Sequence, residues 1–238
     1  MFAAPALADV RLTYITADSH RDSAQVYVQD GRVRLENPRE SRSVIIYESD
    51  RHRFLILDPA DKTFRVVDQR AVDDLRRMIA RVQSAMSALP DSIRGMIDNH
   101  VPTVSALLKY PLPQVAIAAT GATVRTDDYT CRTLTVSVNG GIGYGLCVVP
   151  ASKLGISEDD AQTLASMAED LRRLSGRNLT LKPQVQELLL KDVGVPIKYV
   201  DFRQGQTHLL NTIGRGELSE KVTAIPPDYE QRSLVDVF

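Results

Sequence analysis

Residues that could bind a metal ion or act in catalysis are few in this sequence and lie far apart along the chain. The four histidines, His20, His52, His100 and His208, fall in four separate segments. None of them has a second histidine or a cysteine at the spacing that metal sites require. The sequence therefore predicts no metal site and no bound cofactor.

Two further patterns look like catalytic motifs but have simpler structural explanations. Residues 140–145 (GGIGYG) are rich in glycine, yet they join two strand-like runs, whereas a phosphate-binding loop precedes a helix. The paired acids at 73–74 and 158–160 fall in the first turns of predicted helices, where negative charge interacts favourably with the helix dipole. We predict no catalytic residue and expect the protein not to be an enzyme. An active site assembled from residues distant in sequence is the less favoured alternative.

The two cysteines lie in strand-like runs that a tight turn connects. Cys131 and Cys147 lie about eight residues on either side of Asn139-Gly140, so an antiparallel hairpin would place them close to opposite one another. A disulfide between them is then geometrically feasible. Closing a loop of about 15 residues would add about 3 kcal/mol of stability in the chain-entropy model. Two buried free thiols are the alternative.

The composition is that of an ordinary globular domain. The 238 residues include 29 Lys plus Arg and 30 Asp plus Glu, for a formal net charge of -1, so the broad positive surface of a nucleic-acid-binding protein is not expected. There is no internal repeat or low-complexity linker, and we predict one domain over residues 9–238. No run reaches the roughly 18 apolar residues of a transmembrane helix, so no transmembrane span is predicted.

The first eight residues, MFAAPALA, predict the residual end of a secretory signal peptide. Residues 6–8 (ALA) fit a small-x-small cleavage site, although the basic and long apolar parts of such a peptide are missing. This prediction, with the predicted disulfide, indicates an exported, periplasmic protein. An alanine-rich disordered terminus is the alternative for residues 1–8.

Residues 9–68 show the two-residue alternation of short β-strands. Six apolar runs follow one another at about ten-residue spacing, and Asp30-Gly31 between two of them is a strong hairpin signal. The pattern predicts an antiparallel sheet. The runs at 44–47 and 54–57 are apolar on both faces, which indicates that the middle of the sheet is covered on both sides.

The period changes to three and four residues after Asp68. A stripe of apolar residues from Val72 to Leu89 predicts an amphipathic helix that Pro90 ends. A second short helix near 93–97 and an apolar loop at 102–113 follow, so we predict a helical insertion over residues 69–113.

The rest of the chain is predicted to form strands, then helices, then strands again. Strands are predicted at 115–119, 122–125, 131–138 and 144–149. Ser157 is a predicted N-cap of the helix that follows, whose apolar stripe consists of Leu164, Met167, Leu171 and Leu174. A shorter helix is predicted at 183–192. Strands at 196–202, 208–213 and 221–225 would close the sheet.

With these elements, the chain resembles the periplasmic lipoprotein-carrier superfamily with the LolA/LolB-like fold. Within it, the sequence is most similar to the domain-of-unknown-function family numbered 4412, over residues 9–234. The resemblance depends on residues 26–35 (VYVQDGRVRL), 42–47 (RSVIIY) and 57–64 (LDPADKTF), on the paired cysteine segments 128–131 and 146–147, and on 225–229 (IPPDY).

The resemblance implies an α+β fold: an incomplete antiparallel β-barrel, that is, a strongly curved sheet, covered by amphipathic helices. It also implies a non-enzymatic periplasmic carrier or sensor that binds a lipid or a lipoprotein acyl chain in the concave face of the sheet. A cell-envelope module that binds another protein, or senses stress, and has a dry core is the alternative.

The apolar pattern and the resemblance together predict the residues that would line this hydrophobic cavity. Nine come from the sheet and five from the helical insertion acting as a lid. They are Leu12, Tyr14, Val28, Val33, Leu35, Ile46, Phe54, Ile56 and Phe64 from the sheet, with Met78, Val82, Met86, Leu107 and Leu108 from the lid.

Overall fold

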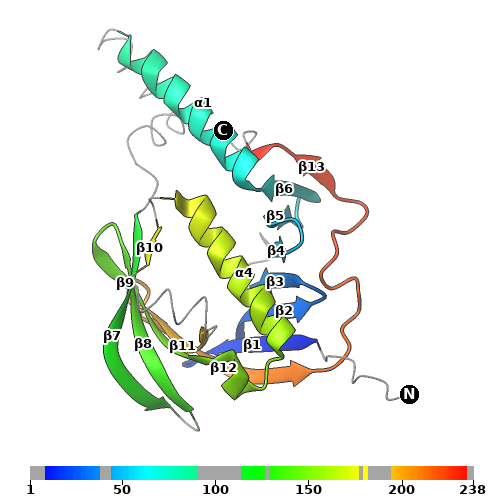
Figure 1. The fold of residues 1–238 in the computed structure, drawn as a ribbon, viewed down its shortest axis with the longest axis vertical. Coiled ribbons are helices and arrows are strands. Elements are labelled where there is room, and N and C mark those ends of the chain that lie inside the picture. The colour runs from blue at the N-terminus through cyan, green and yellow to red at the C-terminus, as the bar shows by residue number, and fades with distance from the viewer. Residues whose placement is uncertain are drawn as a thin grey trace.

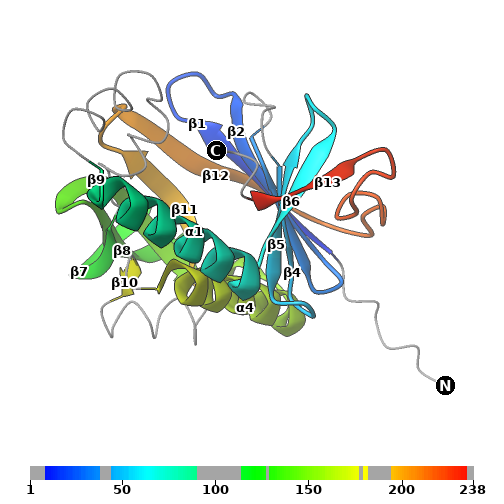
Figure 2. The same ribbon diagram turned by 90° about the horizontal axis from the view of Figure 1, so that it is seen from above.

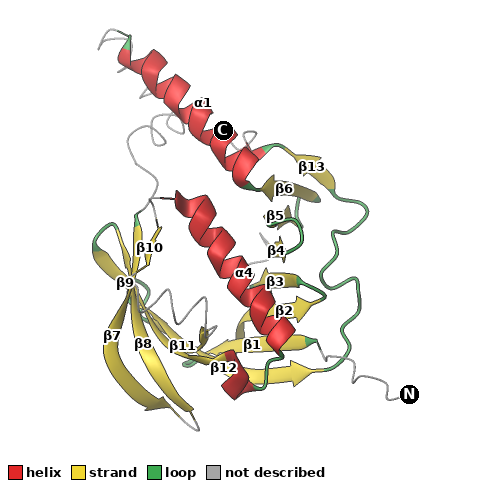
Figure 3. Ribbon diagram, in the orientation of Figure 1, coloured by secondary structure: helices red, strands yellow, loops and turns green. Residues whose placement is uncertain are grey.

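A computed structural model describes residues 9–37, 44–89, 114–126, 129–176, 179–181 and 194–234. These residues form one open, curved sheet of thirteen strands, with one α-helix across its face and a second α-helix that extends from its edge (Figure 1, Figure 3). The strand order is β10-β7-β8-β9-β11-β12-β1-β2-β3-β4-β5-β6-β13. Every neighbouring pair is antiparallel except the outermost pair at each edge, β10 with β7 and β13 with β6. The α+β class and the curved, mostly antiparallel sheet are therefore confirmed.

Six strands form the N-terminal half of the sheet, as the alternation predicts. They are β1 Val10–Thr16, β2 Asp22–Gln29, β3 Arg32–Glu36, β4 Val44–Glu48, β5 Arg53–Asp58 and β6 Thr63–Val67. Asp30 and Gly31 both have positive φ angles (48° and 71°), the backbone geometry of a two-residue hairpin turn between β2 and β3.

The other strands are β7 Val115–Thr126, β8 Tyr129–Val138, β9 Gly141–Pro150, β10 Leu179–Leu181, β11 Gly194–Asp201, β12 Gln206–Arg215 and β13 Glu230–Arg232. The two strands expected at 115–119 and 122–125 are one strand, β7. Its pairing with β8 shifts between Ala119 and Thr123, where Gly121 has a φ of 76°. A bulge at a glycine bends a strand without ending it, and this explains the error.

A disulfide joins Cys131 and Cys147 with a Cα separation of 5.4 Å, as predicted. The two strands turn at Asn139-Gly140, both with positive φ. Cys147 pairs in register with Thr133, two residues from Cys131, so the cysteines are offset along the hairpin. The disulfide therefore ties β8 to β9 at the end of the hairpin that is far from its turn.

The helix α4, Glu158–Ser175, lies across one face of the sheet and contacts β2, β3, β10 and the short 3-10 helix η1, Ala151–Leu154 (Figure 1). The side chain of Ser157 accepts a hydrogen bond from the backbone N–H of Asp160, which confirms the predicted N-cap. We call the sheet face that α4 covers the inner face and the opposite face the outer face.

The helix α1, Gln69–Ser87, starts beside β6 and extends beyond the sheet (Figure 1). Its N-terminal half is close to the C-terminal end of α4 (Figure 2), where the guanidinium of Arg76 donates a hydrogen bond to the carbonyl oxygen of Leu174 at 3.0 Å. None of the α1 side chains that the structure describes is fully buried.

The C-terminal segment covers part of the outer face. The strand expected at 221–225 is wrong, because these residues have no strand structure, and β13 at Glu230–Arg232 pairs with β6 instead. Ile225 and Tyr229 pack against an outer-face cluster. Its buried members are Val44, Ile46, Leu55 and Leu57. The predicted covering of β4 and β5 on both faces is therefore confirmed.

Several predictions lie outside the described residues. These are the leader remnant at 1–8, the short helix near 93–97, the apolar loop at 102–113 and the helix at 183–192.

Candidate functional site

An apolar cavity lies between the inner face of the sheet and α4. Its volume is about 340 Å³. The sheet contributes side chains from β1, β2, β3 and β11, and α4 contributes three more. The lining consists of Leu12, Tyr14, Ala24, Val26, Leu35, Leu164, Met167, Ala168, Gly194, Val195, Pro196 and Tyr199.

Strand register explains why these side chains meet. Leu12 is paired directly with Val26, and Val26 is paired directly with Leu35. Directly paired residues point to the same face of a sheet, and residues two apart on one strand do so too. A row of aliphatic side chains therefore crosses three strands, and Tyr14 and Ala24 form the next pair of the same face.

Helix α4 closes the cavity by its own apolar stripe. Leu164 and Met167 lie three residues apart, so they project from one side of the helix toward the sheet. Leu174 is buried on the same helix, whereas Leu171 is 51% exposed. The stripe predicted for this helix thus includes two lining residues, one core residue and one surface residue.

A buried carboxylate holds α4 against the sheet beyond the cavity. Asp170 accepts a hydrogen bond from the hydroxyl of Tyr47 at 2.6 Å and lies 2.8 Å from Nδ1 of His52. The guanidinium of Arg173 lies 3.0 Å from its other oxygen. Tyr47 is fully buried and Asp170 nearly so. Hydrogen bonds to a buried ionised group are stronger than neutral ones, so this cluster fixes the position of α4 over β4.

Tyr14 closes the other end of the lining. Its hydroxyl donates a hydrogen bond to the carbonyl oxygen of Pro196 at 2.8 Å, and its ring centroid lies 6.4 Å from that of Tyr199. Burial is the main cause that raises the pKa of Tyr14, with a smaller contribution from Tyr199. Burial also raises the pKa of Tyr47, and the hydrogen bond to Asp170 adds to the effect.

These two shifts predict that the protein loses stability at alkaline pH. A tyrosine in the unfolded chain ionises near pH 10, while Tyr14 and Tyr47 stay protonated in the folded state to a higher pH. Their contribution is complete below about pH 10 and is lost as the pH rises above it, because the unfolded state then binds fewer protons. We expect the free energy of unfolding to fall by about 1.4 kcal/mol per pH unit for each tyrosine. Denaturant titrations at pH 9, 10 and 11 measure this slope.

The variant Tyr14→Phe is the control for this pH dependence. It removes one of the tyrosines whose pKa is raised in the folded state, so the slope above pH 10 should become less steep, by about 1.4 kcal/mol per pH unit. An unchanged slope would show that Tyr14 ionises normally in the folded protein.

Three of the predicted sheet residues line the cavity: Leu12, Tyr14 and Leu35. Val28, Val33 and Phe54 belong to the same buried inner-face cluster but lie outside the lining. Ile56 extends the aliphatic row, because Leu35 pairs with Ile45 and Ile45 pairs with Ile56.

Two of the predicted sheet residues, Ile46 and Phe64, point to the outer face and not to the cavity. Ile46 pairs with Leu55, and Phe64 pairs with Leu57, and all four belong to the outer-face cluster under the C-terminal segment. These strands are apolar on both faces, so the sequence pattern does not indicate which of their side chains face a cavity.

Among the described residues, the helix that lines the cavity is α4 and not α1. Met78 and Val82 lie on α1 and do not line the cavity. The side chain of Met86, together with Leu107 and Leu108, lies outside the described residues. The sequence prediction also missed the part of the lining that β11 supplies, at residues 194–199. The apolar alternation of residues 195–199 is the signal that could have identified it.

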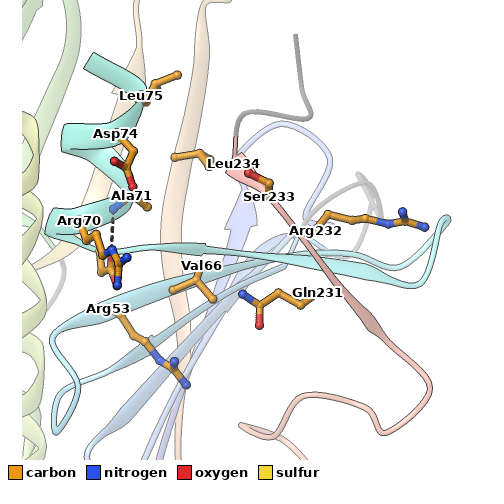
Figure 4. A pocket seen from close by; sticks show the side chains of 11 residues that line it. Arg53, Val66, Arg70, Ala71, Asp74, Leu75, Gln231, Arg232, Ser233 and Leu234 are labelled. Atoms are coloured by element: carbon orange, nitrogen blue, oxygen red, sulfur yellow. Dashed lines mark hydrogen bonds between the residues drawn. The ribbon is translucent and has the colours of Figure 1, made fainter. Parts of the chain in front are cut away.

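Two other depressions differ from the inner-face cavity. A polar one of about 370 Å³ lies between the start of α1, β5–β6 and the segment after β13 (Figure 4). Two of its charged groups have partners within the fold: Asp68 accepts a hydrogen bond from the N–H of Ala71, and Arg53 donates one to Glu48. An apolar depression of about 270 Å³ lies along β7, β8, β9 and β11, and the exposed ring of Phe202 is part of its lining.

Comparison with known proteins adds no homologue, because neither a family model nor a curated protein matches this chain. Within the part of the chain that the structure describes, no helix is long and apolar enough to cross a membrane. No group of three or more histidine, cysteine, aspartate and glutamate side chains among the same residues could hold a metal ion.

Proposed function

We propose that the protein binds a hydrophobic ligand, such as a lipid or an acyl chain, in the cavity between the inner face and α4. The observation that carries the proposal is the lining of this cavity, in which nearly all residues are aliphatic, aromatic or small. Its volume of about 340 Å³ falls in the range of small-molecule sites.

The energetics favour a single chain of moderate length. At about 30 Å³ per water-sized group, the cavity has room for about ten methylene groups. Each buried methylene contributes about 0.8 kcal/mol, so such a chain would gain several kcal/mol over its hydrated state. Because α4 supplies three lining residues, we expect a ligand to lie between this helix and the sheet.

Binding of a fluorescent apolar probe tests the proposal. Because the chain contains no tryptophan, a single introduced tryptophan can also report on its own surroundings by its emission. We expect N-phenyl-1-naphthylamine to bind the unmodified protein with enhanced emission. The substitutions Ala168→Trp and Ala24→Trp place an indole in the cavity, and each should lower probe affinity at least about tenfold because the indole takes the space of several methylene groups.

The matched control is Leu171→Trp on the exposed side of the same helix. This variant should bind the probe as the unmodified protein does, and its indole should emit as a solvent-exposed one. Thermal unfolding of all variants checks that the fold is retained. Full probe affinity in both cavity variants, or no binding to the unmodified protein, would contradict the proposal.

We also propose that the protein is a non-enzymatic carrier or sensor that works in the periplasm, as the LolA/LolB-like resemblance implies, with residues 9–238 as one domain of that kind. The open curved sheet with a helix over an apolar inner face supports this proposal, and so does the disulfide, which persists in oxidising compartments. Mass spectrometry of protein isolated from a bacterial periplasm would test it, since a carrier should retain lipid. Isolation with a protein partner and without lipid would favour the interaction module instead.

A further inference from the structure

Two buried hydroxyl groups lie beside the cavity without a hydrogen-bond partner. Thr16 and Ser23 are each only 6% exposed. Among the described residues, neither Oγ1 of Thr16 nor Oγ of Ser23 has a hydrogen-bond partner. Buried hydroxyls are nearly always paired, because leaving one unpaired costs the hydration that it loses on folding. Two such groups in one place therefore indicate a position for a polar group from outside the chain.

Strand geometry places Thr16 at the end of the cavity that Tyr14 and Tyr199 form. Thr16 lies two residues after Tyr14 on β1, so the two side chains point to the same face. Thr16 is paired directly with His208, whose ring stacks on that of Tyr199 at a centroid distance of 4.1 Å. Since Tyr14 and Tyr199 both line the cavity, the hydroxyl of Thr16 lies one pair of residues beyond it.

Ser23 lies at the same end, on the neighbouring strand. It precedes the lining residue Ala24, at the position where the pairing of β1 with β2 shifts register: Tyr14 pairs with Ala24, but Ile15 pairs with Asp22. Ser23 is the extra residue of this bulge, and bulges often redirect a side chain toward a functional site. The two hydroxyls therefore lie on adjacent strands next to the same pair of lining residues.

The surroundings favour an uncharged head group. Asp18, Arg21 and Asp22, charged residues at or next to the β1–β2 connection, are all exposed, and none of the charged residues that the structure describes lines the cavity. An ionised group at this depth without an opposite charge would lose far more hydration energy than hydroxyls return. A hydroxyl head can donate a hydrogen bond to one of the two side chains and accept one from the other, and an ester carbonyl can accept one from each.

We propose that the ligand is a chain amphiphile with an uncharged, oxygen-bearing head, an alcohol or an ester, and that Thr16 and Ser23 hydrogen-bond this head while the chain lies against Leu12, Val26 and Leu35. This inference rests on the proposed function, since it assigns the polar end of a ligand whose chain fills the apolar cavity.

Competition with the bound naphthylamine probe tests the head site with three molecules of equal chain length: decan-1-ol, decane and decanoate. The unmodified protein should bind decan-1-ol about tenfold more tightly than decane, as expected for two additional hydrogen bonds. It should also bind decan-1-ol more tightly than decanoate at pH 8, where the acid is ionised.

The double variant Thr16→Val/Ser23→Ala removes both hydroxyls with little change in shape. Its affinity for decan-1-ol should fall at least about tenfold, to that of decane or below, because the alcohol hydroxyl is left unpaired, while its affinity for decane stays unchanged. Its melting temperature should stay the same or rise, because two unpaired buried polar groups are lost. Thr13→Val is the matched control: Thr13 is equally buried but lies one residue before Tyr14 and so faces the other side of β1, and decan-1-ol affinity should not change.

The outcomes separate this inference from the proposed function. If no probe or decane binds to the unmodified protein, the proposed function fails. If decane binds but the double variant keeps its full affinity for decan-1-ol, or melts at a clearly lower temperature, the head site is wrong while the apolar cavity stands. Tighter binding of decanoate than of decan-1-ol would overturn the uncharged head.

Discussion

Replacing Asp170 with alanine is expected to lower the free energy of unfolding by about 3 kcal/mol. The substitution removes the acceptor of the Tyr47 hydroxyl, which is fully buried and would be left without its hydrogen bond. A hydrogen bond to an ionised group contributes more than one between neutral groups, and an unpaired buried hydroxyl adds its own cost. The contacts of Asp170 with His52 and Arg173 are lost as well. Urea unfolding, followed by circular dichroism, measures the change.

Two further variants separate the parts of this cluster. Asp170→Asn keeps an oxygen that can accept the Tyr47 hydrogen bond, so it should lose less stability than Asp170→Ala. Arg173→Ala removes a half-exposed partner and should cost less than about 1 kcal/mol, as exposed ion pairs usually do. If Asp170→Ala were no less stable than Arg173→Ala, the buried carboxylate would not be what holds α4 to the sheet.

The local elements of this fold could be read from the sequence because local forces determine them. Strand alternation defines β1 to β6, Asp30-Gly31 and Asn139-Gly140 adopt the positive φ angles of hairpin turns, and Ser157 caps α4. Each of these features depends on residues within a few positions of one another. Such short-range preferences survive in the folded chain whenever tertiary packing does not oppose them.

The edges of the sheet could not be predicted in this way. The strand β13 forms at 230–232 and not at 221–225, because its backbone pairs with β6, more than 160 residues earlier in the chain. The three residues of β13 are charged or polar and exposed, so they lack the apolar alternation that indicates a strand. Pairing between distant segments depends on which strand has an unpaired edge in the folded sheet, and local sequence patterns do not indicate this.

The candidate site was predicted in part for a related reason. Leu12 and Leu35 lie on strands with one clearly apolar face, so alternation assigned them correctly to the inner face. Ile46 lies on a strand that is buried on both sides, where alternation gives no answer. The described residues include two amphipathic helices, α1 and α4, and an apolar stripe shows that a helix packs but not what it packs against.

Loss of the disulfide is the second change expected to have a large effect. The variant Cys131→Ala/Cys147→Ala should lose about 3 kcal/mol, because the bond closes a loop of about 15 residues and so restricts the unfolded chain. The two side chains are buried in the inner-face cluster, so the smaller alanines also leave some space unfilled. Denaturant unfolding of the unmodified protein with and without dithiothreitol should show a difference of similar size.

The double variant is also the control for reduction. Dithiothreitol should leave its unfolding curve unchanged, because it has no disulfide to reduce. Thiol alkylation of the unreduced, unmodified protein should label neither cysteine, and two labelled cysteines would contradict the disulfide.

Probe binding in the cavity is a second measurement of the effect of reduction. The disulfide joins β8 to β9, and β9 pairs with β11, which carries Val195 and Tyr199 of the lining. No lining residue belongs to β8 or β9, so the effect of reduction reaches the cavity only through the pairing of β9 with β11. Reduction should therefore lower the free energy of probe binding by less than it lowers the free energy of unfolding.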